Sequence, residues 1–181
     1  DVLPDQNIDP TKIEAAITNK TKAIMPVHLT GRVCEMDPII ALAEKYSLAV
    51  VEDAAQAIGS KYKDRLSGSF GHVGCFSTHP LKNLNSCGDG GFITTNDEKI
   101  YSEMKALRNH GMSDRNTVNK FGYVSRMDNL QATILNYRLG KLDDIIQKRR
   151  NNAKKYLEKI KTELIDMDKE KDYEFNTYHT F

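Results

Sequence analysis

Residues 75 to 95 read CFSTHPLKNLNSCGDGGFITT and place one lysine, Lys82, between two short apolar segments. The segments are Val73 to Phe76 and Phe92 to Thr95, and the GDGG stretch at 88 to 91 stands just before the second. Glycine permits a positive φ and a close approach of the backbone to a bound group. The pattern indicates a loop that brings one amine against a ligand. Taken alone, it fits a surface hairpin with a solvated lysine better, because lysines are mostly exposed.

The upstream segment LAVVEDAAQAIG, residues 48 to 59, contains two acidic residues that are candidates for the same site as that lysine. We expect a buried strand over Leu48 to Val51, which leads directly into Glu52 and Asp53. In α/β proteins, ligands bind at the carboxyl ends of such strands. A carboxylate there and a separate loop lysine are the pair that pyridoxal phosphate chemistry needs. The lysine forms the Schiff base, and the carboxylate keeps the pyridine nitrogen protonated so that the ring acts as an electron sink.

Three segments of the chain together resemble the DegT/DnrJ/EryC1/StrS family of sugar aminotransferases. They are PVHLTG at 26 to 31, EDAAQAIG at 52 to 59 and FSTHPLKNLNSCGDGG at 76 to 91, and they occur in the family's order. The likeness runs from Asp1 through RNHG and SRMDNLQA to NTYHTF. Against the family, the chain looks like an internal piece, truncated at both ends. It lacks the N-terminal phosphate-binding turn and most of the C-terminal small domain, so we do not expect the 181 residues alone to be active.

The resemblance implies a role for five residues. Lys82 matches the Schiff-base lysine, whose free amine also shuttles a proton between substrate and cofactor. Asp53 matches the carboxylate on the pyridine nitrogen, and Gln56 matches a side chain close to the ring. Ser77 matches a serine that binds the cofactor phosphate, and His28 is placed near the cofactor. By themselves, Gln56 fits a helix-surface glutamine, Ser77 a strand-end serine and His28 a histidine satisfied at a strand end.

One segment departs from the family pattern. The family commonly has G-x-N-x-R, with an asparagine that reaches the phosphate in the neighbouring subunit, whereas residues 122 to 126 read GYVSR. Val124 cannot donate a hydrogen bond from its side chain, so either Ser125 or a backbone amide substitutes, or the phosphate is held more weakly. The resemblance places Arg126 next to the phosphate or the substrate. It therefore implies a homodimer with a shared active site.

Capping residues and hydrophobic spacing predict alternating helices and strands. Residues 109 to 127 are expected to be a long, polar, irregular loop. Helices are expected from Asp9–Pro10, from Asp37–Pro38, from Asn96 or Asp97 to about Arg108, from Asp128 and over 141 to 165; strands are expected over 22 to 27, 48 to 51, 73 to 76 and 92 to 95, with a hairpin over 60 to 66 that turns at Lys63 and Asp64. A strand, helix and strand within about 30 residues form a βαβ unit. The fold class is therefore α/β, with a mostly parallel sheet flanked by helices.

The resemblance makes this the large domain of an aspartate-aminotransferase-type enzyme (fold type I), which binds pyridoxal phosphate. It assigns residues 1 to 140 to that domain, 141 to 165 to an interdomain helix and 166 to 181 to the start of the small C-terminal domain. The basic run Lys148, Arg149, Arg150, Lys154 and Lys155 is interpreted as a solvated helix face and not as a binding patch.

The composition is that of an ordinary soluble protein, with 39% hydrophobic and 28% charged residues and a net charge of +1. Nothing in it suggests a nucleic-acid or membrane partner, and no apolar run approaches the roughly 20 residues that span a bilayer. Three cysteines without CxxC spacing, in a chain without a signal peptide, favour reduced thiols in the cytoplasm. His72, Cys75, His79 and Cys87 are close in sequence but lack the paired short spacings of zinc sites, so no metal is expected.

The leading functional hypothesis is transamination of a keto group on a nucleotide-linked sugar, with glutamate as amino donor, for amino-sugar or surface polysaccharide biosynthesis. A second reading is the family's dehydratase branch, which keeps the cofactor as pyridoxamine and has histidine in place of the lysine. Lys82 argues against it. A third is a degenerate homologue that binds the cofactor without catalysis. Asp53, Gln56 and Lys82 argue against this one, while Val124 leaves it open.

Overall fold

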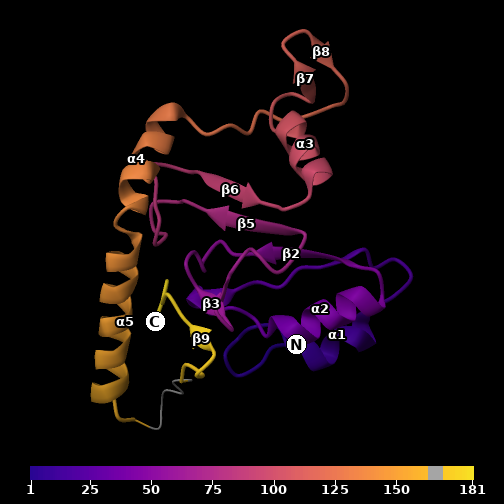
Figure 1. The fold of residues 1–181 in the computed structure, drawn as a ribbon. Coiled ribbons are helices and arrows are strands. Elements are labelled where there is room, and N and C mark those ends of the chain that lie inside the picture. Colours follow the sequence, from indigo (N-terminus) through magenta and orange to yellow (C-terminus); the bar gives the residue numbers. More distant parts are fainter. Residues whose placement is uncertain (163–168) are drawn as a thin grey trace.

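The computed structural model describes residues 1–162 and 169–181. Helices lie on one side of a central sheet and along its edge, and a small hairpin projects from one corner (Figure 1). No helix in these described ranges is both long and apolar enough to cross a membrane.

The central sheet has four strands in the order β1-β2-β5-β6. Strands β1 (Ala23–Ile24), β2 (Ala49–Asp53) and β5 (Val73–Ser77) run parallel to one another. Strand β6 (Gly91–Thr94) pairs antiparallel with β5. The arrows of β2 and β5 point in one direction and that of β6 in the other (Figure 1). The predicted α/β fold with a mostly parallel sheet is confirmed.

Helices α1 (Pro10–Ala16) and α2 (Met36–Lys45) pack together on one face of the sheet (Figure 1). Asp9 caps α1 as predicted, because its side chain accepts a hydrogen bond from the Thr11 amide. Helix α2 begins one residue earlier than the Asp37–Pro38 signal indicated, with Glu35 at its N-cap. Proline is tolerated throughout the first helical turn, so Pro38 marks that turn without marking the first residue.

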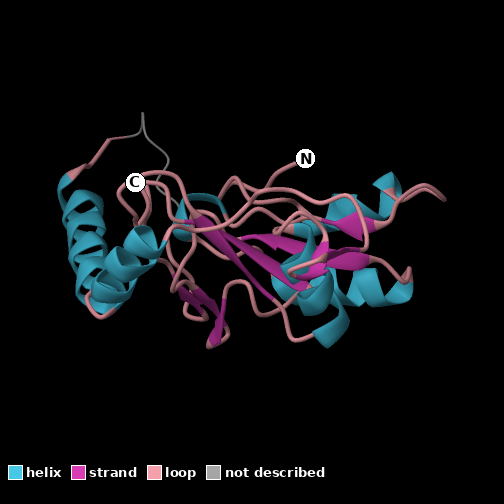
Figure 2. Cartoon of the chain, turned by 90° about the horizontal axis from the view of Figure 1, so that it is seen from above, coloured by secondary structure: helices cyan, strands magenta, loops and turns pink. Residues whose placement is uncertain are grey.

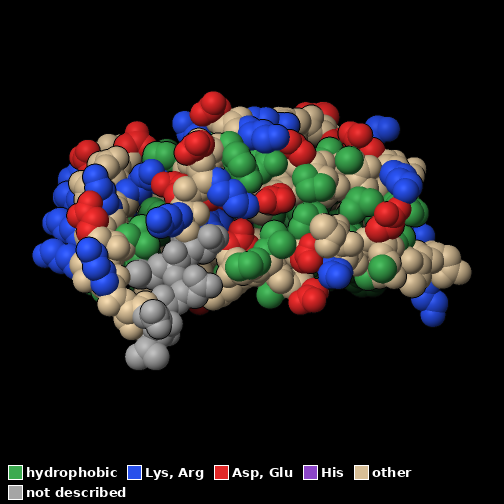
Figure 3. All heavy atoms as spheres, turned by 90° about the horizontal axis from the view of Figure 1, so that it is seen from below, with side chains coloured by type: hydrophobic (Ala, Val, Ile, Leu, Met, Phe, Trp, Pro, Cys, Tyr) green, Lys and Arg blue, Asp and Glu red, His purple; other side chains and the backbone are tan. Residues whose placement is uncertain are grey.

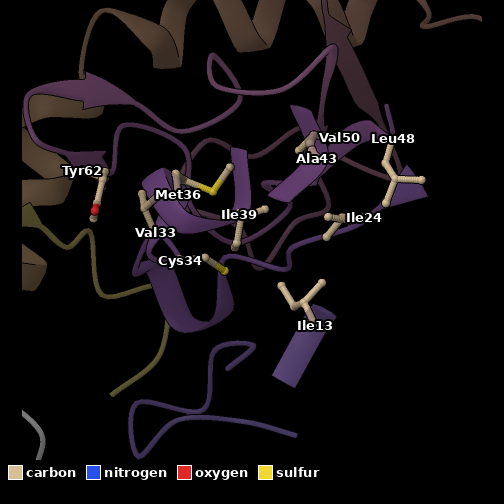
Figure 4. Packing of buried hydrophobic residues seen from close by; sticks show 10 residues of the cluster. All are labelled: Ile13, Ile24, Val33, Cys34, Met36, Ile39, Ala43, Leu48, Val50 and Tyr62. Atoms are coloured by element: carbon tan, nitrogen blue, oxygen red, sulfur yellow. The ribbon is translucent and has the colours of Figure 1, made fainter. Parts of the chain in front are cut away.

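A hydrophobic core joins these helices to β1 and β2 (Figure 4). Its members are Ile13, Ile24, Val33, Cys34, Met36, Ile39, Ala43, Leu48, Val50 and Tyr62. Fully burying a side chain of this kind contributes roughly 1.5–3 kcal/mol to folding. Burial raises the pKa of the Cys34 thiol to about 12, so this cysteine acts as a core residue and not as a nucleophile.

The hairpin predicted over 60 to 66 is present as β3 (Lys61–Tyr62) and β4 (Arg65–Leu66). Its two turn residues, Lys63 and Asp64, have φ values of 48° and 64°, as a tight turn between antiparallel strands requires. Strand β9 (Glu174–Phe175) adds to the free side of β3, so the C-terminal segment returns to the first half of the chain.

The region from 109 to 127 is not simply an irregular loop. After helix α3 (Glu98–Leu107), which Asp97 caps, the chain forms a short hairpin of β7 (Met112–Asp114) and β8 (Thr117–Val118). The Asp114 side chain accepts a hydrogen bond from the Asn116 amide and closes the turn. Strands this short carry too little hydrophobic alternation to be recognised in the sequence.

Helices α4 (Asn129–Leu139) and α5 (Leu142–Lys159) form a column beside the sheet, on the side to which β2 and β5 point (Figures 1 and 2). Leu84, Leu135, Leu142 and Ile146 form a second buried cluster that ties this column to the Lys82 loop. Helix α5 ends before residue 165, and residues 163 to 165 lie outside the described ranges. Lys and Arg side chains gather at the α5 end of the molecule (Figure 3).

Candidate active site

Three of the predicted site residues lie at one edge of the sheet. Asp53 ends β2 and pairs in register with Cys75 of β5, and Ser77 ends β5 two residues later. Lys82 follows in the loop that leaves β5, where its amide donates to the His79 carbonyl at 2.8 Å. Because β2 and β5 are parallel, their carboxyl ends carry these side chains to the same edge. All three are half-buried, so each keeps part of its surface accessible to a ligand.

The two acids at the end of β2 have different environments because successive side chains of a strand point to opposite faces. Glu52 is 0% exposed, and its carboxylate accepts hydrogen bonds from the amides of Gly68, Phe70 and Gly71 at 2.6–2.7 Å. On the other face, Asp53 Oδ1 accepts one hydrogen bond, from the Ala55 amide at 3.0 Å. The second oxygen of Asp53 takes no hydrogen bond from the described residues. Asp53, and not Glu52, is therefore able to receive a ligand.

His28 does not fit the predicted cofactor contact. The ring is 0% exposed, and Nε2 lies 2.9 Å from Glu52 Oε2. Nδ1 accepts a hydrogen bond from the Cys34 amide at 3.2 Å, so Nε2 carries the proton and donates to Glu52. Both ring nitrogens are occupied inside the protein. This expectation is corrected: His28 supports the end of β2, and its backbone amide donates to the Asp53 carbonyl at 2.9 Å.

Gln56 holds a strained turn beside the site. Its Oε1 accepts a hydrogen bond from the Thr30 amide at 2.8 Å, and Thr30 has a φ of 58°. The next residue, Gly31, has a φ of 98°, and a Cβ there would lie 2.8 Å from Thr177 Oγ1 and 2.9 Å from the Tyr178 amide. Only glycine allows the C-terminal segment to pass this close. Because the side-chain carbonyl of Gln56 accepts the hydrogen bond from Thr30, its side-chain amide nitrogen remains available for a ligand.

Ser77 Oγ accepts a hydrogen bond from the His79 amide at 3.3 Å, which leaves its hydroxyl hydrogen for an anion. The glycine-rich loop that follows is anchored from α4. Gln131 pairs with both backbone groups of Cys87, accepting at 2.7 Å and donating at 3.2 Å. Arg138 donates to the carbonyls of Asn85 and Ser86. Helix α4 therefore fixes the loop that contains Lys82 and connects β5 to β6.

The contribution of the C-terminal segment to this site was not predicted from the sequence. Asn83 Nδ2, next to Lys82, donates to the Thr177 carbonyl at 3.1 Å. The amides of Thr177 and His179 donate to the carbonyls of Gly31 and Thr30 at 3.0 and 2.8 Å. These contacts join residues too far apart in the chain for any local pattern to predict.

Helix α5 holds the same segment from the other side. Arg149 donates to the carbonyls of Tyr178 and His179, and Arg150 donates to that of Asn176. Both arginines are half-buried, whereas Lys148, Lys154 and Lys155 are exposed. The basic run of α5 is therefore a solvated face only in part.

Ser125 and Arg126 are not brought to Lys82 within this chain. Both are exposed in an extended stretch between the β7–β8 hairpin and α4. The Ser125 amide donates to the Arg108 carbonyl at 2.9 Å, and Arg126 Nη1 lies 3.4 Å from Asn109 Oδ1. The stretch is thus attached to the end of α3.

The four residues weighed as metal ligands are spread out. His72 precedes β5 and accepts a hydrogen bond from the Val50 amide, whereas His79 follows β5 at its other end. Within residues 1–162 and 169–181, no group of three or more His, Cys, Asp or Glu side chains is placed to hold a metal ion.

Comparison with known proteins identifies the family of the chain. The model of the DegT/DnrJ/EryC1/StrS aminotransferase family matches residues 1–181. The chain belongs to this family. It is 48% identical over 176 residues to dTDP-3-amino-3,6-dideoxy-alpha-D-galactopyranose transaminase of Aneurinibacillus thermoaerophilus, covering 97% of this chain and 48% of that protein. The chain spans about half the length of the curated relatives it matches.

Solved structures of the family share the fold. A DegT/DnrJ/EryC1/StrS aminotransferase from Brucella abortus superposes with a TM-score of 0.94 at 33% identity, covering 99% of this chain and 50% of that one. NtdA from Bacillus subtilis, solved with bound PMP, superposes with a TM-score of 0.78 at 39% identity, covering 84% and 35%. The aminotransferase fold expected for the Lys82 region is confirmed.

Glu52→Gln is expected to lower the free energy of unfolding by about 1–3 kcal/mol at neutral pH, because the amide leaves buried donors of His28 or Gly68 unpaired. Burial alone raises the pKa of Glu52, but hydrogen bonds from His28 and the amides of Gly71 and Gly68 outweigh it. The net pKa lies below its ordinary value of 4.5. Ionised Glu52 therefore stabilises the fold above pH 4.5, and this contribution is lost as the pH falls through the folded-state pKa.

The measurement is denaturant unfolding of wild type and Glu52→Gln at neutral pH and in steps below pH 4.5. The difference between the two proteins should shrink as the solution becomes more acidic. A constant difference across that range would contradict the assignment, and Glu98→Gln, an exposed acid of α3, is the control.

Proposed function

We propose that the full-length protein encoded by the complete reading frame transfers an amino group to a keto carbon of a nucleotide-linked sugar, with pyridoxal phosphate as cofactor. The observation that carries this proposal is that Asp53 and Ser77 end the neighbouring parallel strands β2 and β5, and that the loop leaving β5 contains Lys82. Family membership supports it, since the chain shares 48% of its residues with a sugar transaminase over 97% of its length.

The residues at this edge fit the cofactor. Lys82 has a half-buried amine with no hydrogen bond to the described residues, so it is available for covalent attachment. Asp53 has a carboxylate oxygen available for the pyridine nitrogen, Ser77 a hydroxyl for the phosphate and Gln56 an amide beside the ring. When bound, pyridoxal phosphate supplies an electron sink for the substrate carbon. Lys82 then holds or moves the proton at that carbon, and Asp53 keeps the ring nitrogen protonated.

The finer parts of the proposal are glutamate as amino donor, a role in amino-sugar or surface polysaccharide biosynthesis and a cytoplasmic location. The last is supported by Cys34, Cys75 and Cys87, which are all free thiols. The division into a cofactor domain to residue 140, an interdomain helix and a small domain is proposed on the same footing.

The deciding experiment assays the full-length protein with glutamate and a panel of keto-sugar nucleotides. Transfer of nitrogen from labelled glutamate to a sugar is the expected result. Loss of a sugar hydroxyl without nitrogen transfer would instead indicate the dehydratase chemistry. Cofactor binding without any turnover across the panel would favour a degenerate homologue.

We also propose a homodimer with a shared site. Large apolar side chains lie exposed around the 122 to 126 stretch: Val118, Phe121, Tyr123, Val124 and Leu130 are each at least 63% exposed. Apolar surface gathered in this way is typical of an interface. Arg126 lies on this surface and away from Lys82 of its own chain, so it is proposed to serve the partner's site, with Ser125 in the place of the family's asparagine.

Mixing two inactive variants, Lys82→Ala and Arg126→Ala, is expected to restore activity if the site is shared. A mixed dimer contains one site with both wild-type residues, whereas neither parent dimer contains any. Sedimentation should show dimers for all three samples. Arg115→Ala, at an exposed position of the neighbouring β7–β8 hairpin, is the control and should be active alone. Mixed samples that remain as inactive as the two variants would contradict the shared site.

A further inference from the structure

His179 is the one titratable side chain among the buried polar atoms that lack a partner. Four such side-chain atoms occur in the described ranges, and they are Thr78 Oγ1, Asn83 Oδ1, Asn176 Oδ1 and His179 Nδ1. A buried polar atom that lacks a hydrogen bond destabilises the folded state. Most buried polar atoms in native proteins are hydrogen-bonded, so each exception requires an explanation.

The backbone around His179 is fixed from three directions. Its amide donates to the Thr30 carbonyl at 2.8 Å, and Thr30 is in turn held by Gln56. Its carbonyl accepts from Arg149 Nη1 at 2.9 Å. Two residues before it, the Thr177 carbonyl accepts from Asn83, the neighbour of Lys82. These hydrogen bonds therefore hold the backbone of His179 next to the Lys82 loop, although His179 comes from the far end of the chain.

Lys82, from the loop after β5, and Arg149, from α5, are the charged side chains whose repulsion acts on the imidazole. Burial lowers the pKa of His179 below its ordinary value, and repulsion from Lys82 and Arg149 lowers it further. The ring is thus neutral near pH 7, with a nitrogen able to accept a hydrogen bond. Arg149 already donates to two carbonyls of the segment. Lys82 is the donor without a hydrogen bond to the described residues.

We propose that His179 is a positioning residue of the Lys82 site, whose Nδ1 accepts a hydrogen bond from the Lys82 amine whenever that amine is not bound to the cofactor. The bond holds the lysine in one rotamer, aimed at the position from which it attaches the cofactor and handles the substrate proton. No proton changes owner in this step, and the imidazole stays neutral. The inference rests on the proposed function, because it assigns His179 to the residue that this function makes catalytic.

The test compares three substitutions in the full-length protein. The Oδ1 atom of asparagine occupies the place of Nδ1, whereas glutamine reaches the place of Nε2 and leucine accepts no hydrogen bond. We expect His179→Leu and His179→Gln to lower kcat by about tenfold or more, because the free amine of Lys82 loses its hydrogen bond. Pyridoxal phosphate binding should be no weaker than in wild type, because that hydrogen bond is absent when the cofactor is attached to Lys82. His179→Asn should stay within about threefold of wild type for both quantities. Thr180→Ala, at the exposed neighbour, is the control.

Three readouts separate positioning from folding. They are the dissociation constant of pyridoxal phosphate, the fraction of Lys82 trapped with the cofactor by borohydride, and the melting temperature. Asparagine and leucine variants that have equal kcat, whether both intact or both impaired, would overturn the proposal. If the leucine variant does not fold, the glutamine variant takes its place in that comparison.

A direct measurement needs no substitution at His179. In the cofactor-free protein with labelled histidine, the ¹⁵N shift of His179 Nδ1 should change between wild type and Lys82→Ala, because the donor is lost. An unchanged shift would overturn the proposal. Wild type that binds no pyridoxal phosphate would refute the proposed function itself, whereas wild type that transaminates together with an unimpaired His179→Leu would refute only this inference.

Discussion

Replacing Lys82 by alanine is expected to abolish transamination by the full-length protein. Lys82 is the only lysine of the loop that leaves β5, and it follows Ser77 at the edge where the parallel strands end. Alanine has no amine to attach the cofactor or to move the substrate proton. Since positioned acid–base catalysis alone contributes about 10²–10⁴-fold, turnover should fall by at least that factor.

The measurement is labelled nitrogen transfer from glutamate, together with borohydride trapping of the cofactor on the peptide that contains residue 82. Lys99→Ala, at an exposed position of α3, is the control and should transaminate and trap the cofactor normally. The melting temperature of Lys82→Ala, measured without cofactor, should stay close to that of wild type, because Lys82 lies in a loop and outside both hydrophobic clusters. Retention of more than a few per cent of turnover without an added amine would contradict the assignment.

Asp53→Asn is expected to leave the fold intact and to lower turnover by about 100-fold or more, as the loss of a preorganised electrostatic contact does. The folded state is spared because the Oδ1 of asparagine can still accept the hydrogen bond from the Ala55 amide. The chemistry suffers because a neutral amide cannot hold a pyridine nitrogen in its protonated form as a carboxylate does.

The adjacent acid provides a matched contrast for this prediction. Glu52→Gln should cost stability, whereas Asp53→Asn should cost turnover and change the absorbance of the bound cofactor. The side chains at the two positions point to opposite faces of β2. If Asp53→Asn lost stability and kept its turnover, Asp53 would be a structural acid of the strand end.

Local sequence predicted those parts of the fold that local physics decides. The turn at Lys63 and Asp64 and the cap at Asp9 both depend on residues close together in the chain. Where the signal was weak, the prediction failed by a residue or two, as at the start of α2, or missed an element, as with the β7–β8 hairpin. Two- and three-residue strands leave almost no periodic pattern to read.

His28 shows why the candidate site could be predicted only in part. Its position next to the end of a strand is visible in the sequence, and so is the resemblance that placed it near a cofactor. Its partner, Glu52, is 24 residues away, and the ring is fully enclosed. Which side of a strand end a ring faces depends on what packs there, and that is a property of the tertiary structure.

The sequence by itself determined the family, the α/β class, and the lysine, carboxylate and serine of the candidate site, because these depend on short segments whose residues act together. Only the tertiary structure decided that Glu52 lies inside and Asp53 at the ligand edge. It also decided that Thr177, 94 residues beyond Asn83, supports the Lys82 loop, and that the His179 amide donates to the Thr30 carbonyl. Hydrogen bonds of this kind form only after the chain has collapsed around its core, and no local preference encodes them.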